Sequence, residues 1–161
     1  MELPRGFVYT AYNFDGHYLL VYSVHLKSNY GGVQENIPKR EESARQLLTH
    51  VADVKALHRQ AGAKCVSIVL SGDFNTSLIS DQFAAEKTGQ IILDGGFDWG
   101  FRGMTAEDTV TWLSDGRYPD VTFDHFFSQT DGGAVAGRST VLPTERSVSD
   151  HRPVVMSIRN L

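Results

Sequence analysis

The sequence predicts an α/β fold in which a long amphipathic helix connects two parallel strands of one mixed sheet. Two β-rich runs, residues 6–14 and 17–25, flank the dipeptide Asp15-Gly16, which is a strong signal for a tight hairpin. An apolar stripe with helical spacing follows, and the apolar run 66–70 comes after it. A connection from strand to helix to strand normally joins parallel strands by a right-handed crossover.

Composition indicates one globular domain. The chain has 161 residues, of which 41% are hydrophobic and 21% charged, and it contains no repeat or Pro/Gly-rich linker. A net charge of −4 argues against a sequence-independent grip on nucleic acid by Lys and Arg alone. The single Cys65 excludes an internal disulfide, and no apolar run is long enough to cross a membrane. The sequence is compatible with either a cytoplasmic or a secreted protein.

The predicted helix covers residues 38–61. Pro38 suits its first turn and Gly62 its exit. Its apolar stripe recurs every three or four residues and consists of Ala44, Leu47, Leu48, Val51, Val54, Leu57 and Ala61. The charged residues are expected on its solvated face, and these are Lys39, Arg40, Glu41, Glu42 and Arg45.

Polar side chains follow the buried strand 66–71. Gly72 is expected to let the backbone turn, and Asp73 and Asn75 point to one side while Phe74 anchors the other. A carboxylate beside an amide offers oxygen ligands that Mg²⁺ or Ca²⁺ accepts, although Asp and Asn are also common in ordinary turns. Because parallel strands end at the same edge of a sheet, His25 should emerge beside Asp73.

The second half of the chain adds further elements around this edge. Residues 79–87 suggest a short helix, residues 89–103 a loop, and residues 109–113 and 121–128 a hairpin. Asp124 lies among apolar residues and therefore needs a partner. His151 directly precedes a strand at 152–158, which is expected in the same sheet. We expect Asp124 to hydrogen-bond His151, and Asp150 to lie near Asp73. A lone histidine at a strand end is otherwise a surface or packing residue.

Four motifs in order resemble the endonuclease/exonuclease/phosphatase superfamily, which has the deoxyribonuclease I-like fold. They are His25-Leu26-Lys27-Ser28, Gly72-Asp73-Phe74-Asn75, Phe123-Asp124-His125-Phe126-Phe127 and Ser149-Asp150-His151-Arg152-Pro153-Val154. The resemblance implies a four-layer α/β sandwich and metal-dependent hydrolysis of a phosphate ester by activated water. The substrates that it implies are nucleic acids, phospholipid or inositol phosphate head groups, or small phosphodiesters.

The resemblance also implies site residues. Asp73 resembles the aspartate that orients or deprotonates water, and Asn75 the asparagine that contacts the phosphoryl oxygens near the metal. With Asp150, they would bind Mg²⁺ or Mn²⁺.

Two further motifs supply the remaining catalytic residues. His151 resembles the histidine that acts on the phosphate as base or transition-state stabiliser, with Asp124 as its partner. His25 resembles the histidine that donates to the phosphate or the leaving oxygen.

The sequence lacks the first half of the superfamily's pattern. The superfamily's metal-binding glutamate has no counterpart here, and Glu2 does not stand in an equivalent context. Residues 1–161 are therefore expected to form a single partial domain, the C-terminal half of the sandwich, with helices on one face of its sheet. The isolated chain is expected to be inactive and to form a homodimer through the uncovered face. The alternatives are a catalytically silent binding or scaffold relative and an unrelated α/β binding domain.

Overall fold

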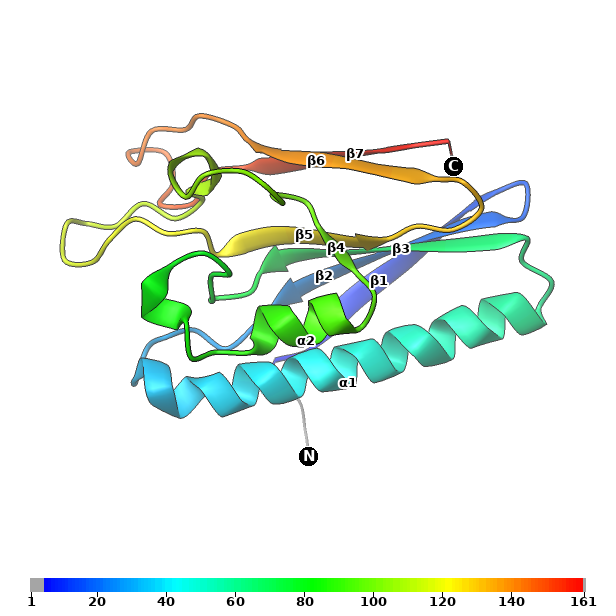
Figure 1. Ribbon diagram of the computed structural model, residues 1–161, viewed down its shortest axis with the longest axis horizontal. Coiled ribbons are helices and arrows are strands. Elements are labelled where there is room, and N and C mark those ends of the chain that lie inside the picture. Colours follow the sequence, from blue (N-terminus) through cyan, green and yellow to red (C-terminus); the bar gives the residue numbers. More distant parts are fainter. Residues whose placement is uncertain (1–4, 161) are drawn as a thin grey trace.

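The computed structural model describes residues 5–160, which form two sheets and two α-helices (Figure 1). The main sheet is mixed, with the strand order β1-β2-β3-β5-β4, and a second sheet pairs β6 with β7. The strands are β1 (Phe7–Phe14), β2 (His17–His25), β3 (Cys65–Asp73), β4 (Asp98–Trp99), β5 (Asp124–Gln129), β6 (Val135–Val141) and β7 (Val154–Arg159). Helices α1 (Val33–Gln60) and α2 (Thr88–Asp94) lie on one side of the main sheet, and β6 and β7 lie on the other, over β5. The predicted mixed sheet with helices on one face is confirmed.

The first three strands fold as the sequence predicts. Strands β1 and β2 pair antiparallel along their whole length, and Asp15 and Gly16 connect them with φ values of 53° and 89°. Both positive angles suit a tight hairpin turn of the type that matches strand twist. Strands β2 and β3 pair in parallel through the α1 crossover, and their register places His25 opposite Asp73.

Helix α1 anchors the core but differs from its prediction at its start, at Arg40 and at the end of its apolar stripe. It begins at Val33, so that Pro38 lies inside the helix and not in its first turn. The first part of its stripe, from Ala44 to Val54, packs on β2 and β3 in one hydrophobic cluster, but Leu57 and Ala61 at its end are exposed, contrary to the prediction. The expectation that Arg40 is solvated is wrong, because its side chain is 0% exposed and pairs with Glu86.

Several later elements also differ from the prediction. Residues 79–87 contain only a short 3-10 turn at Asp81–Phe83, while α2 lies within the stretch expected to be a loop. The expected hairpin is reduced to an isolated bridge between Trp112 and Val121. Strand β7 is not part of the main sheet, because it pairs with β6, an element that sequence analysis did not find. No helix among residues 5–160 is long and apolar enough to cross a membrane.

Candidate functional site

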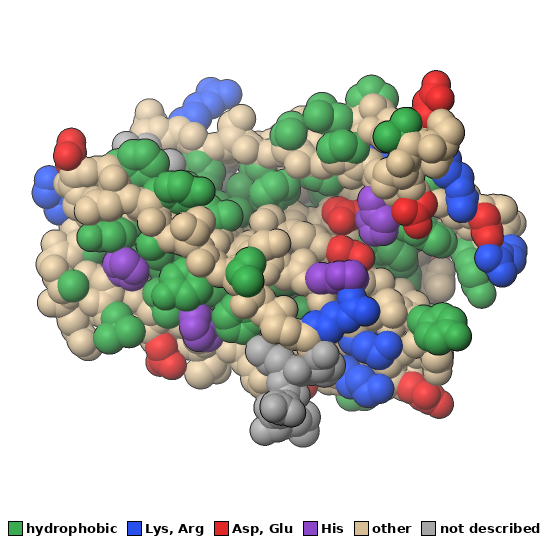
Figure 2. Space-filling view, turned by 180° about the vertical axis from the view of Figure 1, so that it is seen from behind, with side chains coloured by type: hydrophobic (Ala, Val, Ile, Leu, Met, Phe, Trp, Pro, Cys, Tyr) green, Lys and Arg blue, Asp and Glu red, His purple; other side chains and the backbone are tan. Residues whose placement is uncertain are grey.

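Topology brings the predicted site residues to one edge of the main sheet. His25 ends β2 and Asp73 ends β3 in register with it, and Asp124 begins β5 directly opposite Asp73. His151 lies just before β7, a strand of the second sheet, and it forms a bridge with Trp112. In Figure 2, two histidine side chains lie close to several acidic ones on one side of the molecule, with a group of basic side chains nearby.

The pair of His151 and Asp124 has the hydrogen bond that the sequence predicts. Nδ1 of His151 lies 2.7 Å from Oδ2 of Asp124, and both side chains are partly buried. The hydrogen bond to Asp124 raises the pKa of His151 above its ordinary value, and burial opposes this only in part. The charges of Asp73 and Asp150 raise the pKa of His151 further, so the imidazole sits in an acidic surrounding that favours its protonated form.

Two hydrogen bonds from Asn75 hold the carboxylate of Asp73 in one orientation. The backbone N–H of Asn75 donates to Oδ1 of Asp73 at 2.8 Å, and Nδ2 of Asn75 donates to Oδ2 at 3.0 Å. Asn75 has a φ of 54°, which this short polar side chain tolerates, and Phe74 between them is buried in the core. Burial raises the pKa of Asp73, and the neighbouring charge of Asp124 adds to that effect. Asp73 is therefore a stronger base than a solvated carboxylate.

His25 is the more exposed member of the site. Its Nε2 lies 3.5 Å from Oδ2 of Asp73 and 2.6 Å from NH1 of Arg5. Since a guanidinium only donates hydrogen bonds, Nε2 of His25 is the acceptor in the contact with Arg5.

Asp150 does not complete the predicted cluster of oxygen ligands by direct contact. Its Oδ2 accepts a hydrogen bond from Nε1 of Trp112 at 3.2 Å, and the residue is exposed. Among residues 5–160, no group of three or more His, Cys, Asp or Glu side chains is arranged to hold a metal ion. Asp73 and Asn75 offer neighbouring oxygens, but the described side chains alone do not fit a closed magnesium site.

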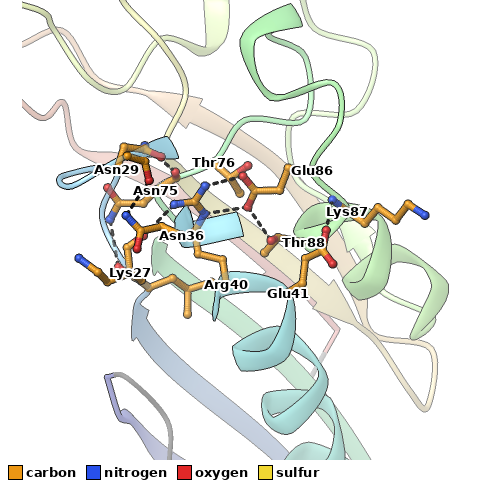
Figure 3. Close-up of polar contacts among 12 residues, drawn as sticks. Lys27, Asn29, Asn36, Arg40, Glu41, Asn75, Thr76, Glu86, Lys87 and Thr88 are labelled. Atoms are coloured by element: carbon orange, nitrogen blue, oxygen red, sulfur yellow. Dashed lines mark hydrogen bonds and ion pairs between the residues drawn. The ribbon is translucent and has the colours of Figure 1, made fainter. Parts of the chain in front are cut away.

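A buried ion pair that sequence analysis missed supports the loops of the site (Figure 3). Nε and NH2 of Arg40 donate to the two carboxylate oxygens of Glu86 at 2.7 and 2.6 Å, and NH1 donates to the carbonyl of Lys27 at 3.0 Å. Nδ2 of Asn29 donates to the carbonyl of Asn75 at 2.9 Å, which ties the loop after β2 to the loop after β3. Arg40 of helix α1 therefore binds the loop after β2 at Lys27 and the loop after β3 at Glu86.

His125 is a second residue of the site to which the sequence analysis assigned no role, although it lies within the third motif. It is buried and neutral, because burial lowers its pKa to about 4. Nε1 of Trp99 donates to its Nδ1 at 3.1 Å, and its Nε2 donates to the carbonyl of Thr76 at 2.9 Å. It thus fixes the backbone that follows Asn75. The only sequence signal for its burial is its position in an apolar strand, two residues before Phe127, so that both side chains point to the same face.

The chain is similar in structure to proteins of the endonuclease/exonuclease/phosphatase group. A mannosyl-6-phosphatase from Bacteroides thetaiotaomicron matches 89% of this chain with 52% of its own, at 16% identity and a TM-score of 0.58. An endonuclease/exonuclease/phosphatase from Beutenbergia cavernae matches 95% of this chain with 39% of its own, at 20% identity and a TM-score of 0.66. TDP2 from D. rerio, in complex with a single-strand DNA product, matches 96% with 61% of its own, at 15% identity and a TM-score of 0.62.

These similarities confirm the fold that the four motifs predict, the deoxyribonuclease I-like α/β fold. The chain spans about half the length of the solved structures that it matches. No protein-family model and no curated protein sequence matches it.

Proposed function

We propose that this chain carries half of a phosphoesterase site, in which His151, Asp124, Asp73, Asn75 and His25 hydrolyse a phosphate ester with activated water. The observation that carries the proposal is the 2.7 Å hydrogen bond between Nδ1 of His151 and Asp124, beside a second, partly buried carboxylate at Asp73. The named similar structures, a phosphatase and TDP2 with a DNA product, support this class of reaction.

Asp124 determines what His151 does in this proposal. A carboxylate that accepts from Nδ1–H fixes the tautomer and directs Nε2 toward the substrate. Because the pKa of His151 is raised, the imidazolium persists at higher pH and can donate from Nε2 to a phosphoryl oxygen. Fixed donors of this kind stabilise the charge that develops on the phosphoryl group.

Asp73 is the residue that accepts the proton of the attacking water. Burial raises its pKa, and the two donors of Asn75 hold its carboxylate in one orientation. Nδ2 of Asn75 also donates to the carbonyl of Leu26 at 3.2 Å, so both amide hydrogens are engaged. Oδ1 of Asn75 is left to accept from a donor or to face a cation.

Magnesium dependence belongs to the proposal as well. Asp73, Asn75 and Asp150 are the candidate oxygen ligands for Mg²⁺ or Mn²⁺, and the cation would supply positive charge next to the phosphate. The described residues do not make a complete site, so no step here relies on the ion. We expect activity to be lost on exhaustive chelation and restored by Mg²⁺.

Activity should be measured on the protein that carries these 161 residues in the cell, with bis-p-nitrophenyl phosphate and p-nitrophenyl phosphate as substrates. His151→Ala should lower the turnover rate on the order of 10³-fold or more, with an unchanged circular dichroism spectrum. The matched control is His58→Ala, on the far half of α1. Near-normal turnover of His151→Ala would refute the proposed role. Phosphate binding without turnover in the unaltered protein would instead indicate a silent binding relative.

A further inference from the structure

A hollow of about 320 Å³ opens directly beside the candidate site. It lies between the start of α1, the segment that follows Trp112, and the chain that leads into β5. His151 and Asn75 contribute to its lining, so its inner end meets the proposed phosphate position. A volume of this size lies within the range of small-molecule sites.

Apart from His151 at its inner end, the hollow is lined by uncharged side chains, and several of them are aromatic. Tyr30, Trp112, Tyr118 and Phe123 line it, and none of the described residues around it is a Lys, Arg, Asp or Glu. Trp112 and Phe123 pack on each other with ring centroids 5.6 Å apart. Tyr30 and Tyr118 are 89% and 62% exposed, so two aromatic rings are available to cover a flat ligand. These walls suit an uncharged planar ring and disfavour a second phosphate or an ionised sugar acid.

One polar atom in the lining lacks a partner. Oδ1 of Asn29 is buried and accepts no hydrogen bond in the described structure, while Nδ2 of the same residue is fixed on the carbonyl of Asn75. This oxygen has almost no exposed surface, so a ligand N–H reaches it only if the Asn29 side chain turns toward the hollow. The amide of Gln82 lies in the same lining and offers both a donor and an acceptor. The hollow is therefore able to bind the hydrogen-bonding edge of a ring as well as its faces.

We propose that this hollow is a nucleobase pocket, and that the substrate of the neighbouring site is a nucleoside phosphate ester. An uncharged heterocycle with an N–H is the chemical class that matches aromatic walls and the adjacent amide of Gln82. The assignment rests on the proposed function only in placing the ligand's phosphate at His151. The contacts of the ring depend on Gln82, Trp112 and Tyr118, none of which is part of the proposed catalytic group.

The test compares ligands that share a phosphate but differ in the ring. Thymidine 5′-monophosphate, ribose 5-phosphate and phenyl phosphate are titrated into the 161-residue chain by calorimetry, and the indole N–H signals of Trp112 and Trp99 are followed by NMR. The nucleotide should bind at least about tenfold more tightly than ribose 5-phosphate, as stacking of one base allows. It should shift the signal of Trp112 and leave that of Trp99, which is bonded to His125, in place.

Variants separate the pocket from a general surface effect. Tyr118→Ala should remove the advantage of the nucleotide and leave ribose 5-phosphate binding unchanged. Tyr12→Ala, at a tyrosine that is 51% exposed on β1, should change neither. Equal affinity for the nucleotide and ribose 5-phosphate, an unmoved Trp112 signal, or equally tight binding of phenyl phosphate would overturn the nucleobase assignment.

Failure of the pocket and failure of the proposed function give different results. Thymidine without a phosphate should still shift the Trp112 signal in His151→Ala if the pocket is correct. Absence of hydrolysis by the unaltered protein, with this shift retained, would refute the proposed function alone. Hydrolysis of bis-p-nitrophenyl phosphate with no response of Trp112 to thymidine would refute the pocket alone.

Discussion

Removing the carboxylate of Glu86 should destabilise the fold more than any surface substitution. Its two oxygens accept from Arg40 at 2.7 and 2.6 Å, and both side chains are 0% exposed. Glu86→Ala therefore leaves a guanidinium buried with one remaining acceptor, the carbonyl of Lys27. Breaking such a pair from one side costs about 3–5 kcal/mol of unfolding free energy.

For a chain of this size, a loss of that magnitude lowers the melting temperature by about 10 °C, since 1 kcal/mol corresponds to roughly 2–4 °C. Urea unfolding followed by circular dichroism measures the free energy directly. The matched control is Glu42→Ala, whose partner Arg45 lies 3.7 Å away on the exposed side of α1. Its expected loss is about 0.5 kcal/mol or less.

A double variant tests whether the cost comes from the unpaired charge. Arg40→Met combined with Glu86→Leu replaces both partners by apolar side chains and should recover most of the loss, because desolvation of both charges is then avoided. A loss below about 1 kcal/mol for Glu86→Ala would refute the reasoning. So would a double variant that is less stable than the single one.

Three further predictions concern the dyad and the open sheet face. Asp124→Asn should lower the pKa of His151, measured by NMR titration, because the hydrogen bond to the carboxylate is the largest cause that raises it. The raised pKa of His151 adds folding stability below pH ~6.5, and this is lost as pH rises through the folded pKa, so unfolding of His151→Gln should depend less on pH there. Val8 and Tyr12, which are 70% and 51% exposed, alternate along β1 with residues that contact α1, and we expect the chain to dimerise through this face. Val8→Lys should then shift the mass from dimer to monomer in light scattering, and a wild-type chain that is already monomeric at micromolar concentration would contradict this.

The parts of the fold that local signals determine could be predicted from the sequence. Asp15-Gly16 predicts the hairpin, and the helical stripe between two strands predicts their parallel pairing. From that pairing alone, His25 and Asp73 must end at the same edge. The hydrogen bond between Asp124 and His151 followed from a carboxylate in an apolar strand, which needs a partner.

The missed features depend on contacts between distant segments. Arg40 lies in a run of charged residues that is typical of a solvated helix face, and nothing local indicates that Glu86, 46 positions later, approaches it. Strand β6 has a register shift between Ala136 and Ser139 and contains a glycine, so its alternation is weak. Because β6 was not predicted, the last strand was assigned to the main sheet, although it pairs with β6.

Gly72 shows how a correct local signal can have a tertiary cause. The glycine before Asp73 predicts a turn, yet Gly72 lies within β3, with a φ of 131°. A Cβ atom at this position would lie 2.0 Å from the carbonyl oxygen of Val24 on β2, which no side chain permits. The glycine is therefore required because the two parallel strands approach closely one residue before His25 and Asp73. Close approach of the backbones, and not chain reversal, places these two side chains within reach of each other.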